Sequence, residues 1–379
     1  MTRPLRVVLN ANIMLAPLTG IGQYVGELAN ALLQRDDVQL SFTYGLRYGP
    51  CLPSQGLRNY SLIRDMAKRM LPKPYQAKRW VERRVLSRAL RVGDADLYHE
   101  PSLWPQHVAR PMVFTLHDLT HVHYPQTQPA DRLRVIEKNL GQALESARQI
   151  LCVSEFTAQQ AMKHYGLSAE RLSITPLGVS PLFQPCAPEE SFVMLRSLGL
   201  QYRSFMLCVA TLEPRKNLEL VFQAMLHLPP LLLAQCPLVL CGSQGWGEIP
   251  PSLAALERSG HVIRTGYLER ESLSRLMGSA RMLLFPSLYE GFGLPIIEAM
   301  ASGTPVITSN CSSMPEVGGD AALYIDPQDP VGLAEAVHRV HDDTELWQSL
   351  QDAGLERARL FSWMRTADLT VDAYKAALS

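Results

Sequence analysis

The hydrophobic pattern of the first half alternates between short apolar runs and longer amphipathic segments. The apolar runs are typical of strands buried in a sheet, and they lie at 6–15, 38–44, 96–100, 111–118, 149–155 and 172–178. Helical periodicity fills the gaps most clearly at 26–33, 131–147 and 157–165. Strands that alternate with helices predict an α/β fold, in which a parallel sheet is covered by helices on both faces.

A second series of the same kind follows a proline-rich passage, TPLGVSPLFQPCAPEE (175–190), which lacks periodicity and is predicted to be a linker. Strands are expected at 204–211, 237–242, 261–268, 280–288, 304–309 and 321–327, with helices starting at Asn217 and Glu271 and covering 331–342 and 344–360. A chain of 379 residues is long enough for two domains. We expect domains at 1–185 and 186–360, two Rossmann-like units that face each other across a cleft, and a separate C-terminal segment at 361–379.

The composition excludes several classes of protein. No window reaches the apolar length of a transmembrane helix, and the N-terminal run lacks the long apolar core of a signal peptide. The seven cysteines are odd in number and form no C-x-x-C pair, which predicts reduced thiols and a cytoplasmic protein. Neither a Walker lysine loop nor a G-x-S-x-G elbow is present, so P-loop and hydrolase functions are disfavoured.

Charge is distributed unevenly although the net charge is zero. Residues 1–185 carry 22 Lys+Arg and 14 Asp+Glu, whereas residues 186–379 carry 14 and 22. The excess is concentrated between Arg58 and Arg91, where eleven basic residues and two acids are interleaved with apolar residues. Such a stretch favours docking on an anionic membrane surface. RNA binding and a solvated helix face are the alternatives.

Two glutamates stand in the stretch SLYEGFGLPIIEAMASGTPVI (287–307). The pattern predicts a strand, a glycine turn, a helix that starts near Pro295 and ends near Gly303, and another strand. Ligands bind beyond the carboxyl ends of such strands, and the helix start attracts anions. Carboxylates there are good acceptors for hydroxyls, so Glu290 and Glu298 suit a nucleotide sugar. Alternatively, Glu290 only complements the helix dipole and Glu298 is a solvated surface residue.

A pair of cations follows another strand of the second half. Arg215 and Lys216, in TLEPRKN (211–217), follow the first strand of the second half. From that strand tip they can reach a pyrophosphate in the crevice that the two glutamates line. Two cations there would stabilise a dianionic leaving group.

Gly20 and Gly22 form a short glycine turn after the first strand. A dinucleotide fingerprint requires a third glycine at position 25, which is Val25, so NAD binding is disfavoured. A loop that approaches a phosphate from the opposing domain remains open.

His117, His121 and His123 lie within seven residues and superficially resemble a metal site. The spacing does not match H-E-x-x-H, and no distant carboxylate or cysteine partner can be nominated. We therefore expect no metal ion, and we expect His117, at the end of a strand, to make a polar contact facing the cleft.

Taken together, these residues resemble the retaining glycosyltransferases of the GT4 family, which have the two-domain GT-B fold. The resemblance covers nearly the whole chain. It rests on the Gly20–Gly22 loop, His117, ITPLGV (174–179), Arg215–Lys216, TGYL (265–268), the E-x7-E spacing of Glu290 and Glu298 around GFGLP, and FSW (361–363). It implies that C-terminal helices return to the N-terminal domain, with a crossover helix at 361–379.

The resemblance also implies a role for each site residue. Glu290 would contact the sugar hydroxyls and Glu298 the ribose, while Arg215 and Lys216 would hold the pyrophosphate. The remaining contacts would come from backbone N–H groups at Phe292, Gly293 and Leu294, from Tyr267 and Leu268 beside the base, from Gly20 and Gly22 near the donor phosphate, and from His117 on the sugar or acceptor side.

The function implied is a metal-independent, retaining hexosyltransferase without a cofactor, whose donor is a nucleotide sugar. The N-terminal half is similar to bacterial mannosyl- and rhamnosyltransferases of O-antigen synthesis. That similarity favours a GDP-linked donor, a lipid-linked saccharide acceptor and a location at the cytoplasmic face of the inner membrane, with no nucleic-acid partner. A GT-B nucleotide-sugar epimerase and a UDP-sugar-dependent transferase are the alternatives.

Overall fold

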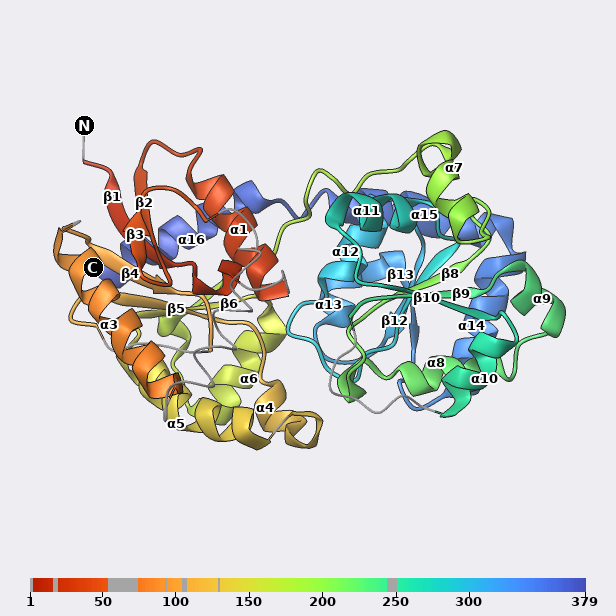
Figure 1. Cartoon of the computed structure of the whole chain (residues 1–379), viewed down its shortest axis with the longest axis horizontal. Helices are drawn as coiled ribbons and strands as arrows, with labels where there is room; N and C mark the ends of the chain where they lie inside the picture. The colour runs from red at the N-terminus through yellow and green to blue at the C-terminus, as the bar shows by residue number, and fades with distance from the viewer. Residues whose placement is uncertain are drawn as a thin grey trace. The chain divides into compact units, whose positions relative to one another are not determined.

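A computed structural model describes residues 3–15, 20–53, 74–92, 94–103, 108–128, 130–243 and 251–379. The chain divides into two compact units (Figure 1). The first unit contains Met1–Leu119, Ala130–Gly178 and Trp363–Ser379, and the second contains Thr120–Pro129 and Val179–Ser362. The predicted boundary at 185 therefore lies seven residues beyond the point at which the chain enters the second unit.

The first unit is built on a seven-stranded sheet with the order β3-β2-β1-β4-β5-β6-β7. Its strands are β1 (Leu5–Asn10), β2 (Val38–Tyr44), β3 (Arg47–Gly49), β4 (Leu97–Glu100), β5 (Met112–Leu116), β6 (Gln149–Cys152) and β7 (Leu172–Ile174). Its helices are η1 (Asn12–Leu15), α1 (Gly20–Leu32), α3 (Pro74–Val92), α5 (Ala130–Ser146), α6 (Glu155–Tyr165), η3 (Ala169–Arg171) and α16 (Trp363–Leu378). All described pairs are parallel except β2 with β3.

The second unit is built on a six-stranded parallel sheet with the order β10-β9-β8-β11-β12-β13. Its strands are β8 (Met206–Val209), β9 (Leu238–Cys241), β10 (Val262–Gly266), β11 (Met282–Phe285), β12 (Val306–Ser309) and β13 (Ala322–Ile325). Its helices are α4 (Thr120–His123), η2 (Pro125–Thr127), α7 (Pro188–Ser197), η4 (Pro214–Lys216), α8 (Leu218–Met225), α9 (Pro230–Gln235), α10 (Pro251–Arg258), α11 (Arg270–Gly278), α12 (Leu294–Ala301), α13 (Met314–Gly318), η5 (Gly319–Ala321), α14 (Pro330–Asp342) and α15 (Thr344–Ala358). The strands between the two sheet edges are almost completely buried, as their continuous apolar runs predict.

The predicted α/β architecture is confirmed, and each predicted strand overlaps an observed one. The structure differs from the sequence analysis in four details. Residues 12–15, the end of the predicted strand 6–15, form the 3-10 helix η1. The glycine turn at Gly20–Gly22 is the first turn of α1, because these residues already have helical backbone geometry. The short hairpin strand β3 was missed because three residues carry too little alternation to be read. The predicted linker ends in α7, whose first residue, Pro188, is favoured at a helix start.

The C-terminal helix returns to the first unit, as the resemblance implied; Figure 1 shows the blue α16 among the red and orange elements. Tyr374 on α16 contacts the buried His99 of β4, with 2.7 Å between the phenol oxygen and Nδ1. Thr366 donates a hydrogen bond to the carbonyl of Pro176 at 2.6 Å. These contacts bury α16 against the first sheet.

Candidate functional site

Three charged residues of the second unit, Arg215, Lys216 and Glu290, lie where the strand order of its sheet reverses. β8 lies beside β11, while the chain continues outward to β9 on one side and to β12 on the other. In open α/β sheets, ligands bind outside the carboxyl ends of the strands at this reversal. Arg215 and Lys216 follow β8, and Glu290 follows β11.

Backbone and amide contacts fix the two loops against each other. The backbone N–H of Leu288 donates to the carbonyl of Arg215 at 2.9 Å. The side-chain amide of Asn217 donates to the carbonyls of Pro286 and Pro327, at 3.1 and 2.8 Å. The segment from Arg215 to Asn217 thus holds together the loops after β8, β11 and β13. The sequence spacing alone could not show this.

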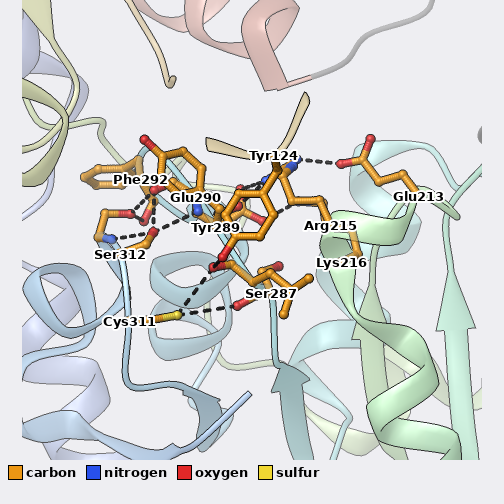
Figure 2. A network of polar contacts seen from close by, with 12 residues as sticks. Tyr124, Glu213, Arg215, Lys216, Ser287, Tyr289, Glu290, Phe292, Cys311 and Ser312 are labelled. Atoms are coloured by element: carbon orange, nitrogen blue, oxygen red, sulfur yellow. Dashed lines mark hydrogen bonds and ion pairs between the residues drawn. The ribbon is translucent and has the colours of Figure 1, made fainter. Parts of the chain in front are cut away.

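Glu290 is the centre of a compact charge cluster (Figure 2). Its Oε1 accepts from Lys216 Nζ at 2.6 Å, and its Oε2 lies 2.6 Å from Arg215 Nη1. The other arm of Arg215 donates to Glu213 Oε1 at 2.6 Å. The side chains of Arg215, Lys216 and Glu290 are only 12%, 15% and 10% exposed, so water screens these charges weakly.

The pKa values reflect this arrangement. Burial alone would raise the pKa of Glu290, but Arg215 and Lys216 outweigh burial and lower it to about 2. The pKa of Lys216 is also lowered, because burial and repulsion from Arg215 outweigh the attraction of Glu290 and Glu213. The two directions are compatible because Glu290 faces two cations, whereas Lys216 has another cation beside it.

The backbone of the Glu290 loop is held by two serines that the sequence analysis did not select. Ser312 Oγ accepts from the N–H of Glu290 at 2.8 Å and lies 2.6 Å from its carbonyl oxygen. Ser313 Oγ lies 2.9 Å from the carbonyl oxygen of Glu290 and 3.0 Å from that of Phe292. The only sequence signal was a serine pair just after a strand, which is ordinary loop composition.

The glycine turn and the helix after Glu290 form as predicted. Gly293 has φ of 102° and caps α12, and a proline stands in the first turn. Glu298 lies inside α12 and is 4% exposed, so its interpretation as a solvated surface residue was wrong. Phe292 is also buried, and its ring packs on that of Phe361, with 5.7 Å between the ring centroids.

Aromatic residues from the connection after β5 flank the cluster within the second unit. The ring centroids of His123 and Tyr124 lie 5.2 and 5.7 Å from that of Tyr289. The Tyr124 hydroxyl contacts the carbonyl oxygen of Leu288 at 3.4 Å (Figure 2). These contacts explain why Thr120–Pro129 belongs to the second unit, although the prediction placed it in the N-terminal domain.

The remaining predicted site residues lie elsewhere. In the first unit, Nε2 of the partly buried His117 lies 2.8 Å from the carbonyl oxygen of Pro101, and Gly20 and Gly22 lie at the start of α1. In the second unit, Tyr267 and Leu268 follow β10, and Tyr267 is 49% exposed. Among the described residues, no three histidine, cysteine or acidic side chains are grouped so that they could hold a metal ion.

The first unit contains a buried polar cluster that the sequence analysis missed. It lies at the reversal of strand order between β1 and β4. Glu100 is completely buried and accepts hydrogen bonds from Asn10 at 2.9 Å, from Tyr98 at 2.6 Å, and from the N–H and hydroxyl of Ser102 at 3.1 and 2.7 Å. Burial raises the pKa of Glu100 to about 7 despite these donors. A lone glutamate at the end of a strand gave no signal that it would be buried.

Two units, each built on a largely parallel sheet covered by helices, define a protein of the GT-B fold. Solved structures support this fold. Sucrose-phosphate synthase from Thermosynechococcus elongatus has a TM-score of 0.74 at 22% identity, covering 98% of each chain. HepE from Anabaena, in complex with UDP-glucose, has a TM-score of 0.72 at 16% identity, covering 98% of this chain and 99% of that one.

The chain belongs to glycosyltransferase family 4. Residues 18–181 match the model of Glycosyltransferase Family 4, and residues 197–357 match that of Glycosyl transferases group 1. O-antigen chain mannosyltransferase B of Escherichia coli is 34% identical over 369 residues, which cover 95% of this chain and 96% of that protein. The predicted family is therefore confirmed.

Proposed function

We propose that this protein is a retaining mannosyltransferase that extends an O-antigen saccharide from a GDP-linked donor. The observation that carries this proposal is the buried cluster of Arg215, Lys216 and Glu290 at the switch point of the second sheet. Cations for a diphosphate and a carboxylate for hydroxyls suit a nucleotide sugar. The similarity to the O-antigen mannosyltransferase of E. coli supports mannose as the sugar, with rhamnose as the other candidate.

The second unit supplies the donor contacts in this proposal. Arg215 and Lys216 hold the diphosphate and stabilise the charge that develops on it as the glycosidic bond breaks. Glu290 accepts hydrogen bonds from the sugar and Glu298 from the ribose. The backbone N–H groups at the start of α12 (Phe292, Gly293 and Leu294) face the sugar or phosphates, and Tyr267 and Leu268 flank the base.

The transfer itself requires one bond to form and one to break. The acceptor hydroxyl oxygen attacks the anomeric carbon from the face that the diphosphate leaves, so the configuration is retained. The bond between the anomeric carbon and the diphosphate oxygen breaks, and the proton of the acceptor hydroxyl passes to the departing diphosphate. Gly20, Gly22 and His117 of the first unit act on the donor phosphate and acceptor side, and no metal ion is required.

The direct test is transfer with purified protein. GDP-mannose, GDP-rhamnose and UDP-glucose are each incubated with a synthetic lipid-linked saccharide, and the product linkage is determined by NMR. We expect acceptor-dependent consumption of GDP-mannose and an α-linked product. Consumption of a UDP-sugar alone would overturn the GDP assignment, and sugar release without any acceptor would favour the epimerase alternative.

We also propose that the first unit docks on anionic lipid through α3. The described side chains of this helix expose four arginines on one face (Arg83, Arg84, Arg88 and Arg91). Val92 beside them is 71% exposed. Leu46, in the turn of the β2–β3 hairpin that α3 contacts, is 75% exposed. Residues 58–73 of the predicted basic stretch lie outside the described part of the chain. Within that part, no helix is long and apolar enough to cross a bilayer.

A further inference from the structure

Glu290 forms ion pairs with both cations, Arg215 and Lys216, that the proposed function assigns to the donor diphosphate. Each carboxylate oxygen has its own partner, because Oε1 contacts Lys216 and Oε2 contacts Arg215, both at 2.6 Å. Glu213 adds a second carboxylate, so the two cations and two anions of this cluster cancel. The cluster therefore has no net charge, and it differs from a positively charged pocket that would bind an anion directly.

A diphosphate cannot simply be added to this arrangement. It would bring at least two negative charges within a few ångströms of a carboxylate that is only 10% exposed. Like charges at such a distance repel strongly where water is scarce, on the order of 4 kcal/mol per pair of unit charges at 4 Å. The Glu290 carboxylate and the diphosphate therefore cannot both contact the two cations, and one of them must move away. The hydroxyls of a sugar are hydrogen-bond donors and can satisfy a displaced carboxylate.

The neighbouring contacts indicate which group moves. Arg215 is anchored independently of Glu290, because it donates to Glu213 and to the carbonyl of Tyr289, each at 2.6 Å. The backbone of Glu290 is held by the Ser312 hydroxyl. Arg215 and the loop can therefore stay in place while the side chain of Glu290 rotates.

We infer that Glu290 is a partner-exchanging counter-ion: it leaves Arg215 and Lys216 for the hydroxyls of the bound sugar, and it returns to them after transfer. Once the sugar has gone, the returning carboxylate competes with the nucleoside diphosphate and promotes its release. This inference rests on the proposed function of the same site. It gives Glu290 a second task, which is to make the site prefer the intact donor over the spent nucleotide.

The test compares two affinities in three proteins. Isothermal titration calorimetry measures the Kd of GDP and of GDP-mannose, without acceptor, for the wild type, Glu290→Gln and Glu213→Gln. Glu213→Gln is the matched control, since it removes a carboxylate that also contacts Arg215 at 2.6 Å but is not assigned to the sugar.

We expect Glu290→Gln to bind GDP about tenfold more tightly, as one freed charge-assisted contact allows. Its affinity for GDP-mannose should change little, because the lost contact to the sugar offsets the freed cations. The ratio of the Kd for GDP to the Kd for GDP-mannose should therefore fall about tenfold. In Glu213→Gln both ligands should bind more tightly by a similar factor, so that the ratio stays at its wild-type value.

Each outcome bears on a different claim. If Glu290→Gln binds GDP no more tightly than the wild type, or tightens both ligands equally, the exchange is refuted and the proposed function stands. If the wild type binds neither these ligands nor UDP and UDP-sugars, the proposed function itself fails. Should Glu290→Gln fail to fold, Glu290→Asp takes its place, since it keeps the charge with a shorter reach. The ratio of the Kd for GDP to the Kd for GDP-mannose should still fall in Glu290→Asp. An unchanged ratio in a folded Glu290→Asp would also refute the exchange.

Discussion

Gly242 allows a sharp test of how the second sheet supports the site. It follows β9 with φ of +150°, and its N–H donates to the carbonyl of Gly266 at 2.9 Å. A Cβ at this position would lie 2.0 Å from the carbonyl oxygen of Ala210 and 2.6 Å from its carbonyl carbon. Ala210 directly follows β8, on the path to Arg215 and Lys216. Gly242→Ala must therefore push apart the backbone segments that lead into the site.

The cost has two parts. A non-glycine residue held in this region of φ costs roughly 1–3 kcal/mol, and overpacking against fixed backbone costs roughly 1–3 kcal/mol more. The control is Gly260→Ala, where φ is +76° but nothing lies within 4 Å of the new Cβ. It should cost only the left-handed penalty of about 1–2 kcal/mol.

The assay is thermal unfolding followed by circular dichroism, together with sugar transfer. For a domain the size of the second unit, 1 kcal/mol of lost stability lowers the Tm by roughly 2–4 °C. We therefore expect the Tm to fall by about 10 °C in Gly242→Ala and by about 4 °C in Gly260→Ala. Transfer should fall only in Gly242→Ala, measured well below either Tm. Equal Tm losses in the two variants would show that the close approach of Gly242 to Ala210 does not constrain the sheet.

Four further predictions address the proposed chemistry and the charged groups. Lys216→Ala should lower kcat by roughly 10²–10³ with a smaller effect on the donor Kd, and unchanged turnover in the folded variant would remove Lys216 from the mechanism. Transfer should persist in EDTA, whereas activity lost in chelator and restored by one divalent metal would contradict the metal-free proposal. The wild type should sediment with anionic but not neutral vesicles and be released by salt; binding should weaken when the exposed arginines of α3 become glutamate, and equal binding to both kinds of vesicle would leave α3 as a solvated face. Glu100 has a folded pKa of about 7, above its usual 4.5, so its contribution to stability is full below pH 4.5 and is lost, by about 3 kcal/mol, as the pH rises through 7. Glu100→Gln should remove that slope from denaturant-unfolding curves measured between pH 4.5 and 8, and an unaltered slope would show that Glu100 is not its source.

Much of the donor-side loop could be predicted from sequence because its determinants are local. Glycines and a proline between two apolar runs predicted the turn, the start of α12 and the end of that helix before Gly303. Parallel strands place their carboxyl ends at one edge, so Arg215, Lys216 and Glu290 were expected on the same side of the sheet. The structure brings them into direct contact.

The sequence by itself determined the alternation of strands and helices, the two sheets and the family, since apolar periodicity and short motifs are properties of neighbouring residues. Tertiary structure alone decided which strands adjoin, and therefore that residues 74 positions apart, Lys216 and Glu290, form an ion pair. It also decided that Glu100 is buried among four donors and that Thr120–Pro129 packs on the second unit. The physical reason is that burial and charge pairing depend on the packing of distant segments, and a one-dimensional pattern of polarity does not record which segments meet.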